Sequence, residues 1–403
     1  MKTTGKPKVR KPSPNESAQG GQIVLLSVTG QSPAVLTETV WALAHEKPAI
    51  IPHRIVVITT TEGRDTLKSE LLSPPENSVW DQLRCRLEGL GHNLAGRLQF
   101  GDTPQDIRVF TMFDPKLKRN RELADITSKE ENAAAADIIM EVVRGLAMDD
   151  GVRLVASIAG GRKTMSSLLF SVMSLLGKED DLITHIIVNE PFESRGLKPK
   201  FYFPPAESVT HHGVDREDKP ISIGSEKANI QLGRIPFVAL RNLFERDLKK
   251  KQSYNRLVEE CQRTANEHAK KHVRLAMRRS RREIRVNDQP LTLSPLQHLL
   301  LLFLAENAFA GRSVAGKFAN ALEPLAEFAA QLRKSCNPQD GNDRRDEAIL
   351  PGDFDDERLR KVLDELKAKL RSAGTQAAAL ISVFPVKGRF SLDLPSSSIR
   401  LRD

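Results

Sequence analysis

The chain has few cysteines and no apolar run long enough to cross a membrane. Its three cysteines, Cys85, Cys261 and Cys336, lie far apart in 403 residues and show no paired spacing. The sequence therefore contains neither a zinc motif nor a disulfide framework, and it has no cluster of His, Cys and Asp with the spacing of a metal site. We expect reduced thiols, no metal and no cofactor.

The first twenty residues lack the apolar core of a signal peptide. They are polar, basic and rich in Pro, Ser and Gly, which predicts a disordered basic leader over residues 1–20. Together with the lack of a long apolar run, this favours a cytoplasmic protein with no membrane contact. A chain of 403 residues with 39% hydrophobic residues is long enough for two domains and a sizeable core.

The positive charge is concentrated in one segment. Residues 241–285 contain fifteen Lys and Arg and six Asp and Glu, an excess of nine that equals the net charge of the whole chain. Such a stretch can bind nucleic acid, but a solvated helix face has the same composition. Charge alone leaves both interpretations open.

Between residues 21 and 210, apolar β-rich runs alternate with amphipathic segments. In chain order, the expected elements are a strand at 22–28, a helix at 33–46, a strand at 54–60, a helix ending near Gly89, short strands near 97–100 and 107–110, a helix at 131–147, a strand at 152–159, a helix after Lys163 and a strand at 183–192. Buried strands that alternate with helices predict an α/β fold, here a Rossmann-like domain with a mostly parallel sheet.

The rest of the chain predicts a linker and a smaller α+β domain. Residues 211–281 read as a linker and basic connecting helices, because prolines, histidines and charges break the periodicity first. Residues 282–403 read as a winged-helix-like domain. Its expected features are a turn at Asn287 and Asp288, a helix opened by Ser294 with Pro295 at its first position, and a late hairpin with Lys387 and Gly388 near its turn.

Three strand ends of the predicted sheet carry polar residues. In an open parallel sheet, ligands bind beyond the carboxyl ends of the strands, where helix N-termini attract anions. The residues at these three ends are Thr29, Gly30, Gln31 and Ser32; Thr60, Thr61 and Glu62; and Gly160, Gly161, Arg162, Lys163 and Thr164.

The third strand end, "SIAGGRKTM", points most directly to a phosphate. Its glycines allow close approach to the backbone, and Arg162 and Lys163 supply charge. The glycine spacing excludes a Walker A loop, and the single glycine of "VTGQSPA" excludes the dinucleotide fingerprint. We favour a phosphate-bearing ligand over the alternative that the glycines only make a tight turn.

These motifs resemble a known family. The stretches "LLSVTGQSPAVLTETVWALA", "RIVVITTTEGRD", "ADITSKEENAAAADIIMEVVR", "SIAGGRKTMSSLLFSVMSLLGKEDDLITHIIVNEPFE" and "FYFPP" are similar to the CRISPR-associated Rossmann-fold (CARF) domain of CRISPR-associated ring nucleases. The resemblance covers roughly residues 22–205. It implies a homodimer that binds cyclic oligoadenylate, the messenger of type III CRISPR antiviral defence, with a twofold-symmetric ring such as cyclic tetra-adenylate across the dimer axis.

The resemblance also implies roles for individual residues. Thr29, Gly30, Gln31 and Ser32 would line the ring, and Arg162, Lys163 and Thr164 would hold its phosphates. Thr60, Thr61 and Glu62 would reach adenine edges or ribose hydroxyls. Asn132, at the start of the alanine-rich helix, is a further ligand candidate with helix capping as its alternative role.

Ring cleavage needs little machinery. A ribose 2′-hydroxyl can attack its neighbouring phosphorus without a metal and leave linear products with 2′,3′-cyclic phosphate ends. Lys163 and Arg162 fit the stabilisation of charge, and Ser32 or Thr29 fits the orientation of the hydroxyl. No histidine lies at the three polar strand ends to act as a general base, so the sequence supports binding more strongly than cleavage.

Two other functions stay open. A sensor would bind the ring without turnover and change the DNA or protein contacts of the winged-helix-like domain, although many acids surround its expected recognition helix. A HEPN-type ribonuclease would use Arg263 and His268, whose spacing in "RTANEH" fits the Arg-to-His pattern of that class.

Overall fold

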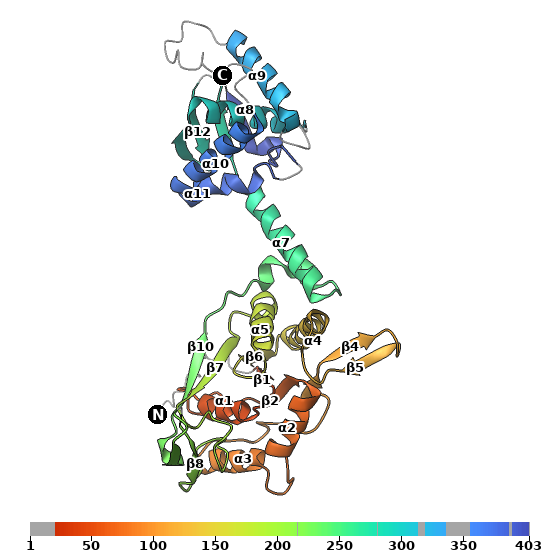
Figure 1. The fold of residues 1–403 in the computed structure, drawn as a ribbon, viewed down its shortest axis with the longest axis vertical. Coiled ribbons are helices and arrows are strands. Elements are labelled where there is room, and N and C mark those ends of the chain that lie inside the picture. Colours follow the sequence, from red (N-terminus) through yellow and green to blue (C-terminus); the bar gives the residue numbers. More distant parts are fainter. Residues whose placement is uncertain are drawn as a thin grey trace, which may run out of the picture. The chain divides into compact units, whose positions relative to one another are not determined.

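The computed structural model describes residues 21–215, 217–279, 281–312, 319–335, 355–386 and 389–402. The chain divides into two compact units, residues 1–259 and 260–403 (Figure 1). The predicted leader at 1–20, Cys336, and the hairpin residues Lys387 and Gly388 lie outside the described residues. Within those residues, Cys85 and Cys261 form no disulfide, and no helix has the length and apolar character to span a membrane.

Six strands form the central sheet of the first unit. They are β1 (Gln22–Val28), β2 (Arg54–Thr59), β3 (Ile107–Val109), β6 (Val152–Ser157), β7 (Leu182–Val188) and β10 (Ile230–Ile235). Their order across the sheet is β10-β7-β6-β1-β2-β3, and every neighbouring pair is parallel except β10 with β7. The prediction of a mostly parallel α/β sheet is confirmed. The central strands are buried on both faces, which explains their continuous apolar sequences.

Helices cover both faces of this sheet (Figure 1). They are α1 (Ala34–Ala44), α2 (Thr61–Leu71), α3 (Val79–Gly89), α4 (Lys129–Ala147) and α5 (Lys163–Leu176). The helices α1 and α3 share one apolar cluster with strand residues such as Leu25 and Ile55, whereas α4 and α5 pack together on the opposite face. Helices α1, α2 and α5 directly follow β1, β2 and β6, so their N-termini gather at the carboxyl edge of the sheet.

The segment predicted as the start of a linker is ordered instead. Two antiparallel strands, β8 (Thr210–Val214) and β9 (Pro220–Gly224), form a hairpin, and β10 adds the antiparallel edge of the main sheet. The sequence pattern missed these strands because an edge strand and a solvated hairpin do not need a long apolar run. A second hairpin, β4 (Thr111–Asp114) with β5 (Arg119–Glu122), projects from the sheet (Figure 1). The strand expected near 97–100 is only an isolated bridge between Arg54 and Gln99.

The second unit contains a four-stranded sheet of order β13-β12-β11-β14. Its strands are β11 (Leu275–Arg278), β12 (Glu283–Val286), β13 (Gln289–Thr292) and β14 (Ile399–Arg402). The predicted turn at Asn287 and Asp288 is confirmed, with φ angles of 47° and 68°, both in the left-handed region. Strand β11 falls within the segment assigned to connecting helices, and that part of the prediction is wrong.

The longer helices of this unit are α8 (Pro295–Phe309), α9 (Leu322–Ser335) and α10 (Asp356–Ser372). The predicted start of α8 is confirmed: Ser294 Oγ accepts a hydrogen bond from the Gln297 N–H at 3.4 Å, and Pro295 is the first helical residue. The apolar stretch of α8 is buried in the core of this unit.

The remaining elements are the long helix α7 (Tyr254–Lys271) and several short segments. Among the described residues of the expected late hairpin, Val386 and Arg389 form an isolated bridge, and the apolar run before it is a 3-10 helix at Ala379–Val383. Helix α7 contains the point in the sequence at which the two units divide. The other short helices are Ser225–Lys227, Arg241–Leu243, α6 (Glu245–Leu248), Ala319–Ala321, α11 (Thr375–Ala378) and Ser396–Ser398.

Candidate functional site

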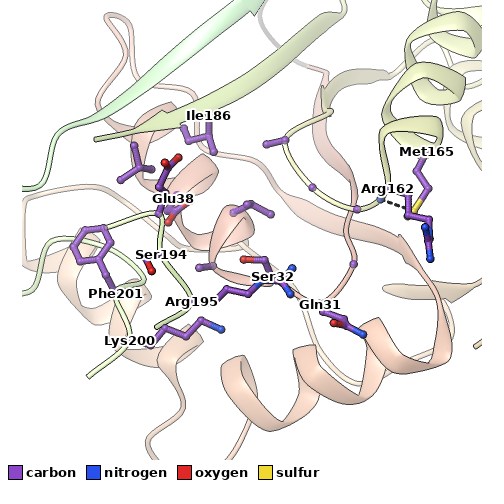
Figure 2. Close-up of a pocket in the computed structure, with 18 of the residues that line it drawn as sticks. Gln31, Ser32, Glu38, Arg162, Met165, Ile186, Ser194, Arg195, Lys200 and Phe201 are labelled. Atoms are coloured by element: carbon purple, nitrogen blue, oxygen red, sulfur yellow. Dashed lines mark hydrogen bonds between the residues drawn. The ribbon is translucent and has the colours of Figure 1, made fainter. Parts of the chain in front are cut away.

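A cavity of about 490 Å³ lies beyond the carboxyl ends of the parallel strands. Strand β1 lies between β2 and β6, so the three polar strand ends singled out in the sequence are neighbours in space. Eight of their residues line the cavity: Gly30, Gln31, Ser32, Thr60, Glu62, Gly160, Gly161 and Arg162. Figure 2 shows several of these side chains around the space.

The other five residues predicted for the site do not line this cavity. They are Thr29, Thr61, Lys163, Thr164 and Asn132. Thr29 is fully buried, and its hydroxyl donates to the Gly30 carbonyl oxygen at 3.1 Å. Lys163 and Thr164 are exposed in the first turn of α5, next to the cavity-lining Arg162.

Asn132 neither lines the cavity nor caps its helix. Helix α4 begins earlier, at Lys129, and Ser128 is its N-cap. The Ser128 hydroxyl accepts from the Glu131 N–H at 3.1 Å, and the Glu131 carboxylate accepts from the Ser128 N–H at 3.2 Å, which makes a capping box. The capping role weighed for Asn132 is therefore wrong, because the true capping residues lie upstream.

The glycines are needed first for packing. A Cβ atom on Gly160 would lie 2.8 Å from the Val28 carbonyl oxygen, and one on Gly30 would lie 3.2 Å from the Cα of Gly161. Gly161 also has a φ of +77°, which L-residues with side chains rarely adopt. The tight-turn alternative thus accounts for these glycines, and the close contact brings the loops after β1 and β6 together at the cavity.

Arg162 is held in place by an acidic partner. Its Nε donates to Asp125 Oδ1 at 2.6 Å, and its Nη2 donates to Asp125 Oδ2. Hydrogen bonding to Arg162 lowers the pKa of Asp125, and the same bond raises the pKa of Arg162. The Arg162 backbone N–H donates to the Met165 sulfur at 3.3 Å (Figure 2). Arg162 is half-exposed at the cavity rim, where a bound anion would compete with Asp125 for its guanidinium.

The second strand end is also partly occupied by local bonds. Thr60 is the N-cap of α2, and its hydroxyl accepts from the Gly63 N–H at 3.2 Å. Gln31 Nε2 donates to Glu62 Oε2 at 2.7 Å, which links the loops after β1 and β2 across the rim. These side chains line the cavity, and each already has a hydrogen-bond partner within the protein.

The sequence interpretation missed a whole wall of the cavity. The segment after β7 contributes Phe192, Glu193, Ser194, Arg195, Lys200 and Phe201. Figure 2 shows Arg195 extending toward Ser32. Lys200 Nζ lies 2.5 Å from Glu70 Oε2, so its charge is shared with that carboxylate. The signal for this wall was present, because "ESRGLKPK" follows a fourth strand end that reaches the same edge of the sheet.

Glu38 of α1 is a buried acid in the cavity wall. Glu38 was not selected as a site residue in the sequence analysis, because its position within a helix did not show that its side chain faces the cavity. Burial is the largest cause that raises the pKa of Glu38 to about 7; the nearby Glu193 raises it further and Lys200 lowers it. The cavity thus has cations on its rim and a weak acid in its wall.

The chemistry of the cavity suits an anion that also carries an apolar or aromatic part. Arg162 and Arg195 lie at the rim, and the N-terminus of the fourteen-residue helix α5 begins immediately after Arg162. Deeper in the wall are Ile186, Val188 and Phe201. Among the described residues, no group of three or more His, Cys, Asp or Glu side chains is arranged to hold a metal ion.

Fold and cavity together define a Rossmann-like α/β protein with a candidate ligand site at the carboxyl edge of its parallel strands. The chain belongs to the family of CRISPR-associated protein NE0113, whose sequence pattern matches residues 32–267. No curated protein matches the chain.

Two solved structures are similar over most of the chain, at low identity. Protein VC1899 from Vibrio cholerae is 9% identical with a TM-score of 0.22, and the match covers 87% of this chain and 58% of that one. This chain therefore spans less than two thirds of the length of VC1899. Enterococcus italicus Csm6 bound to cyclic hexa-2′-fluoro-hexa-dAMP is 11% identical with a TM-score of 0.27, and the match covers 88% and 79% of the two chains.

Proposed function

We propose that the first unit binds cyclic oligoadenylate, with cyclic tetra-adenylate as the preferred ring, and cleaves it without a metal. The observation that carries this proposal is the meeting of Arg162, Arg195 and the N-terminus of α5 at one cavity of a CRISPR-associated chain. Phosphates of the ring would lie against these positive groups, because helix N-termini and guanidinium groups bind phosphate oxygens.

The proposed complex contains two copies of the chain. A cavity of about 490 Å³ would hold part of a cyclic tetranucleotide but would not enclose it. A ring with twofold symmetry fits an isologous homodimer in which each copy supplies one cavity. Each copy would then contact the same part of its half of the ring.

Cleavage would use the ring's own nucleophile. A ribose 2′-oxygen forms a bond to the adjacent phosphorus while the bond from phosphorus to the 5′-oxygen breaks. The 2′-hydroxyl loses its proton, the 5′-oxygen gains one, and the product is linear with a 2′,3′-cyclic phosphate. Ser32 would orient the 2′-hydroxyl, and Arg162 with the exposed Lys163 would stabilise charge on the phosphate oxygens.

The test is a single-turnover incubation with cyclic tetra-adenylate in the presence of EDTA, with products resolved by chromatography. We expect linear products from the wild type, and loss of most of them in Lys163→Ala and Ser32→Ala. Lys219→Ala is the matched control, since Lys219 is an exposed lysine of the β8–β9 hairpin paired with Glu217.

Each outcome decides between the functions. Linear products from the wild type and the control, but not from the two site variants, support a ring nuclease at this site. Tight binding with an intact ring would overturn the proposal of cleavage and favour a sensor that acts through the second unit. Absence of binding would overturn the proposal that cyclic oligoadenylate is the ligand.

A further inference from the structure

Glu38 lies in the middle of α1 and faces the cavity from its inner wall. The residue is 4% exposed, yet it lines the cavity together with Val35, one turn before it on the same helix. The neighbouring wall is apolar and comes from Ile186 of β7 and Phe201 of the following segment. A buried acid in such surroundings is costly unless it is neutral or binds something.

No hydrogen bond or ion pair within the described part of the chain joins the Glu38 carboxyl to another side chain. The charged and titratable groups that line the same cavity are His185, Glu193, Arg195, Lys200, Glu62, Asp125 and Arg162. Of these, Glu193 and Lys200 act on Glu38, in opposite directions, while burial has the largest effect. The carboxyl therefore carries its proton in a substantial part of the molecules near neutral pH.

A protonated carboxyl matches the edge of an adenine. It offers an O–H donor beside a carbonyl acceptor. Adenine offers the N6 amino donor beside a ring-nitrogen acceptor, N1 on one edge or N7 on the other. An ionised carboxylate has lost the donor and adds a negative charge near the phosphates of the ring. The apolar wall around Glu38 suits the flat face of a base.

We propose that Glu38, in its protonated form, hydrogen-bonds the edge of one adenine of the bound ring and so makes the site select adenine. The inference rests on the proposed function, because it names the group that reads the base of that ligand. It assigns the phosphates to the rim and the base to the inner wall of the cavity. Each Glu38 would contact one base.

Two substitutions separate this role from a structural one. In Glu38→Gln the carboxamide keeps a donor beside an acceptor, as when Gln reads adenine, but cannot ionise. In Glu38→Leu both hydrogen bonds are lost while the side chain still fills the apolar wall. Binding of cyclic tetra-adenylate is measured by calorimetry from pH 6 to 8, beside a cyclic tetranucleotide of unsubstituted purine riboside, which lacks the 6-amino group.

The expected results are specific. Wild-type affinity falls about tenfold from pH 6 to 8 for each Glu38 that contacts the ring, since the pKa of this group is about 7. Glu38→Gln binds as the wild type does at pH 6 and loses this pH dependence. Glu38→Leu binds adenine rings about tenfold more weakly at pH 6 and loses the preference for adenine over unsubstituted purine.

The outcomes separate the two proposals. If the wild type binds the ring but Glu38→Leu keeps its affinity and its adenine preference, Glu38 does not read the base and only this inference fails. A pH dependence that persists in Glu38→Gln belongs to another group of the protein and also overturns it. If the wild type binds no ring at any pH, the proposed function fails and this inference fails with it.

Discussion

Arg162 and Asp125 form a two-bond ion pair at the rim of the cavity, although they are 37 positions apart in the chain. Arg162 immediately precedes α5, and Asp125 lies in the segment that leads to α4. Arg162, which the sequence analysis expects to bind a phosphate, therefore has an acidic partner before any ligand binds. A phosphate of the proposed ring would have to replace Asp125 or share the guanidinium with it.

Removal of the acidic partner should strengthen ring binding. Asp125→Asn keeps the shape of the side chain but removes its charge, so the guanidinium of Arg162 becomes available to a phosphate. We expect the affinity for cyclic tetra-adenylate to rise about two- to fivefold, because exposed ion pairs of this kind are weak. Calorimetric titration measures the change. Asp114→Asn, in the β4–β5 hairpin away from the cavity lining, is the control; a weaker complex in Asp125→Asn would show that Asp125 positions Arg162 for the ligand.

Arg195 should contribute to binding from the wall that the sequence interpretation missed. Arg195→Ala is expected to weaken the ring complex about tenfold and to reduce its sensitivity to salt, since it removes one charge beside the phosphates. The measurement is the dissociation constant at two salt concentrations. Arg108→Ala is the matched control, because Arg108 is an arginine of β3 that pairs with Glu141 and does not line the cavity. Equal effects of the two variants would remove Arg195 from the site.

Gly160 should tolerate no side chain. In Gly160→Ala the new Cβ would meet the Val28 carbonyl oxygen at 2.8 Å, so the loops after β1 and β6 have to separate. We expect the free energy of unfolding of the first unit to fall by about 1–3 kcal/mol. Gly145→Ala is the control: Gly145 lies within α4 with open space around its Cβ position, and alanine there should raise that free energy by up to about 1 kcal/mol.

Urea denaturation followed by tryptophan fluorescence measures both glycine variants. The two tryptophans of the chain, Trp41 and Trp80, both belong to the first unit and report on it. Stability of Gly160→Ala equal to that of the wild type would show that the loops can separate without cost, and the packing explanation for this glycine would then be wrong.

The carboxylate of Glu131, at the start of α4, should make stability depend on acid pH. Hydrogen bonds from the Thr127 backbone, the Thr127 hydroxyl and Arg121 lower the pKa of Glu131 to about 2, below its ordinary value of 4.5. The ionised group therefore stabilises the folded state fully above pH 4.5, and this contribution is lost as the pH falls through about 2.

Glu131→Gln tests this dependence. We expect it to lower the free energy of unfolding by about 1 kcal/mol at neutral pH, with the difference from the wild type closing between pH 4.5 and 2. Glu130→Gln changes a neighbouring first-turn acid outside the capping box and should show a smaller difference. A gap for Glu131→Gln that stays constant with pH would contradict the assignment of the charge.

The ribonuclease alternative gains no support from the geometry of α7. Arg263 and His268 are both exposed on this continuous helix. Two side chains five positions apart in an α-helix point in directions about 140° apart around the helix axis. We expect the double variant Arg263→Ala, His268→Ala to cleave the ring as the wild type does. RNA cleavage is measured with a labelled RNA in the presence of cyclic tetra-adenylate, and we expect the double variant and the wild type to give the same result. Gln262→Ala with Asn266→Ala is the control on the same helix; selective loss of RNA cleavage in the first double variant would establish a ribonuclease.

Local signals in the sequence predicted much of the first unit. Apolar β-rich runs gave the central strands within a few residues, and the pattern Ser294-Pro295 gave the start of α8, because strand burial and helix capping are encoded within a few neighbouring residues. Several strands escaped prediction, among them β5, β8 to β11 and β14, because they are short or lie at sheet edges and depend on their pairing partners. The winged-helix-like identity of the second unit stays a prediction.

The sequence by itself determined that three polar strand ends would meet at one edge of a parallel sheet, since chain order and burial dictate that arrangement. Only the tertiary structure decided which side chains face the cavity and which partners they have. Asp125 lies in the loop before α4, Arg195 in the segment after the fourth strand end, and Glu38 on the inner face of α1. Their directions, and the raised pKa of Glu38, follow from packing between distant segments, which no local pattern records.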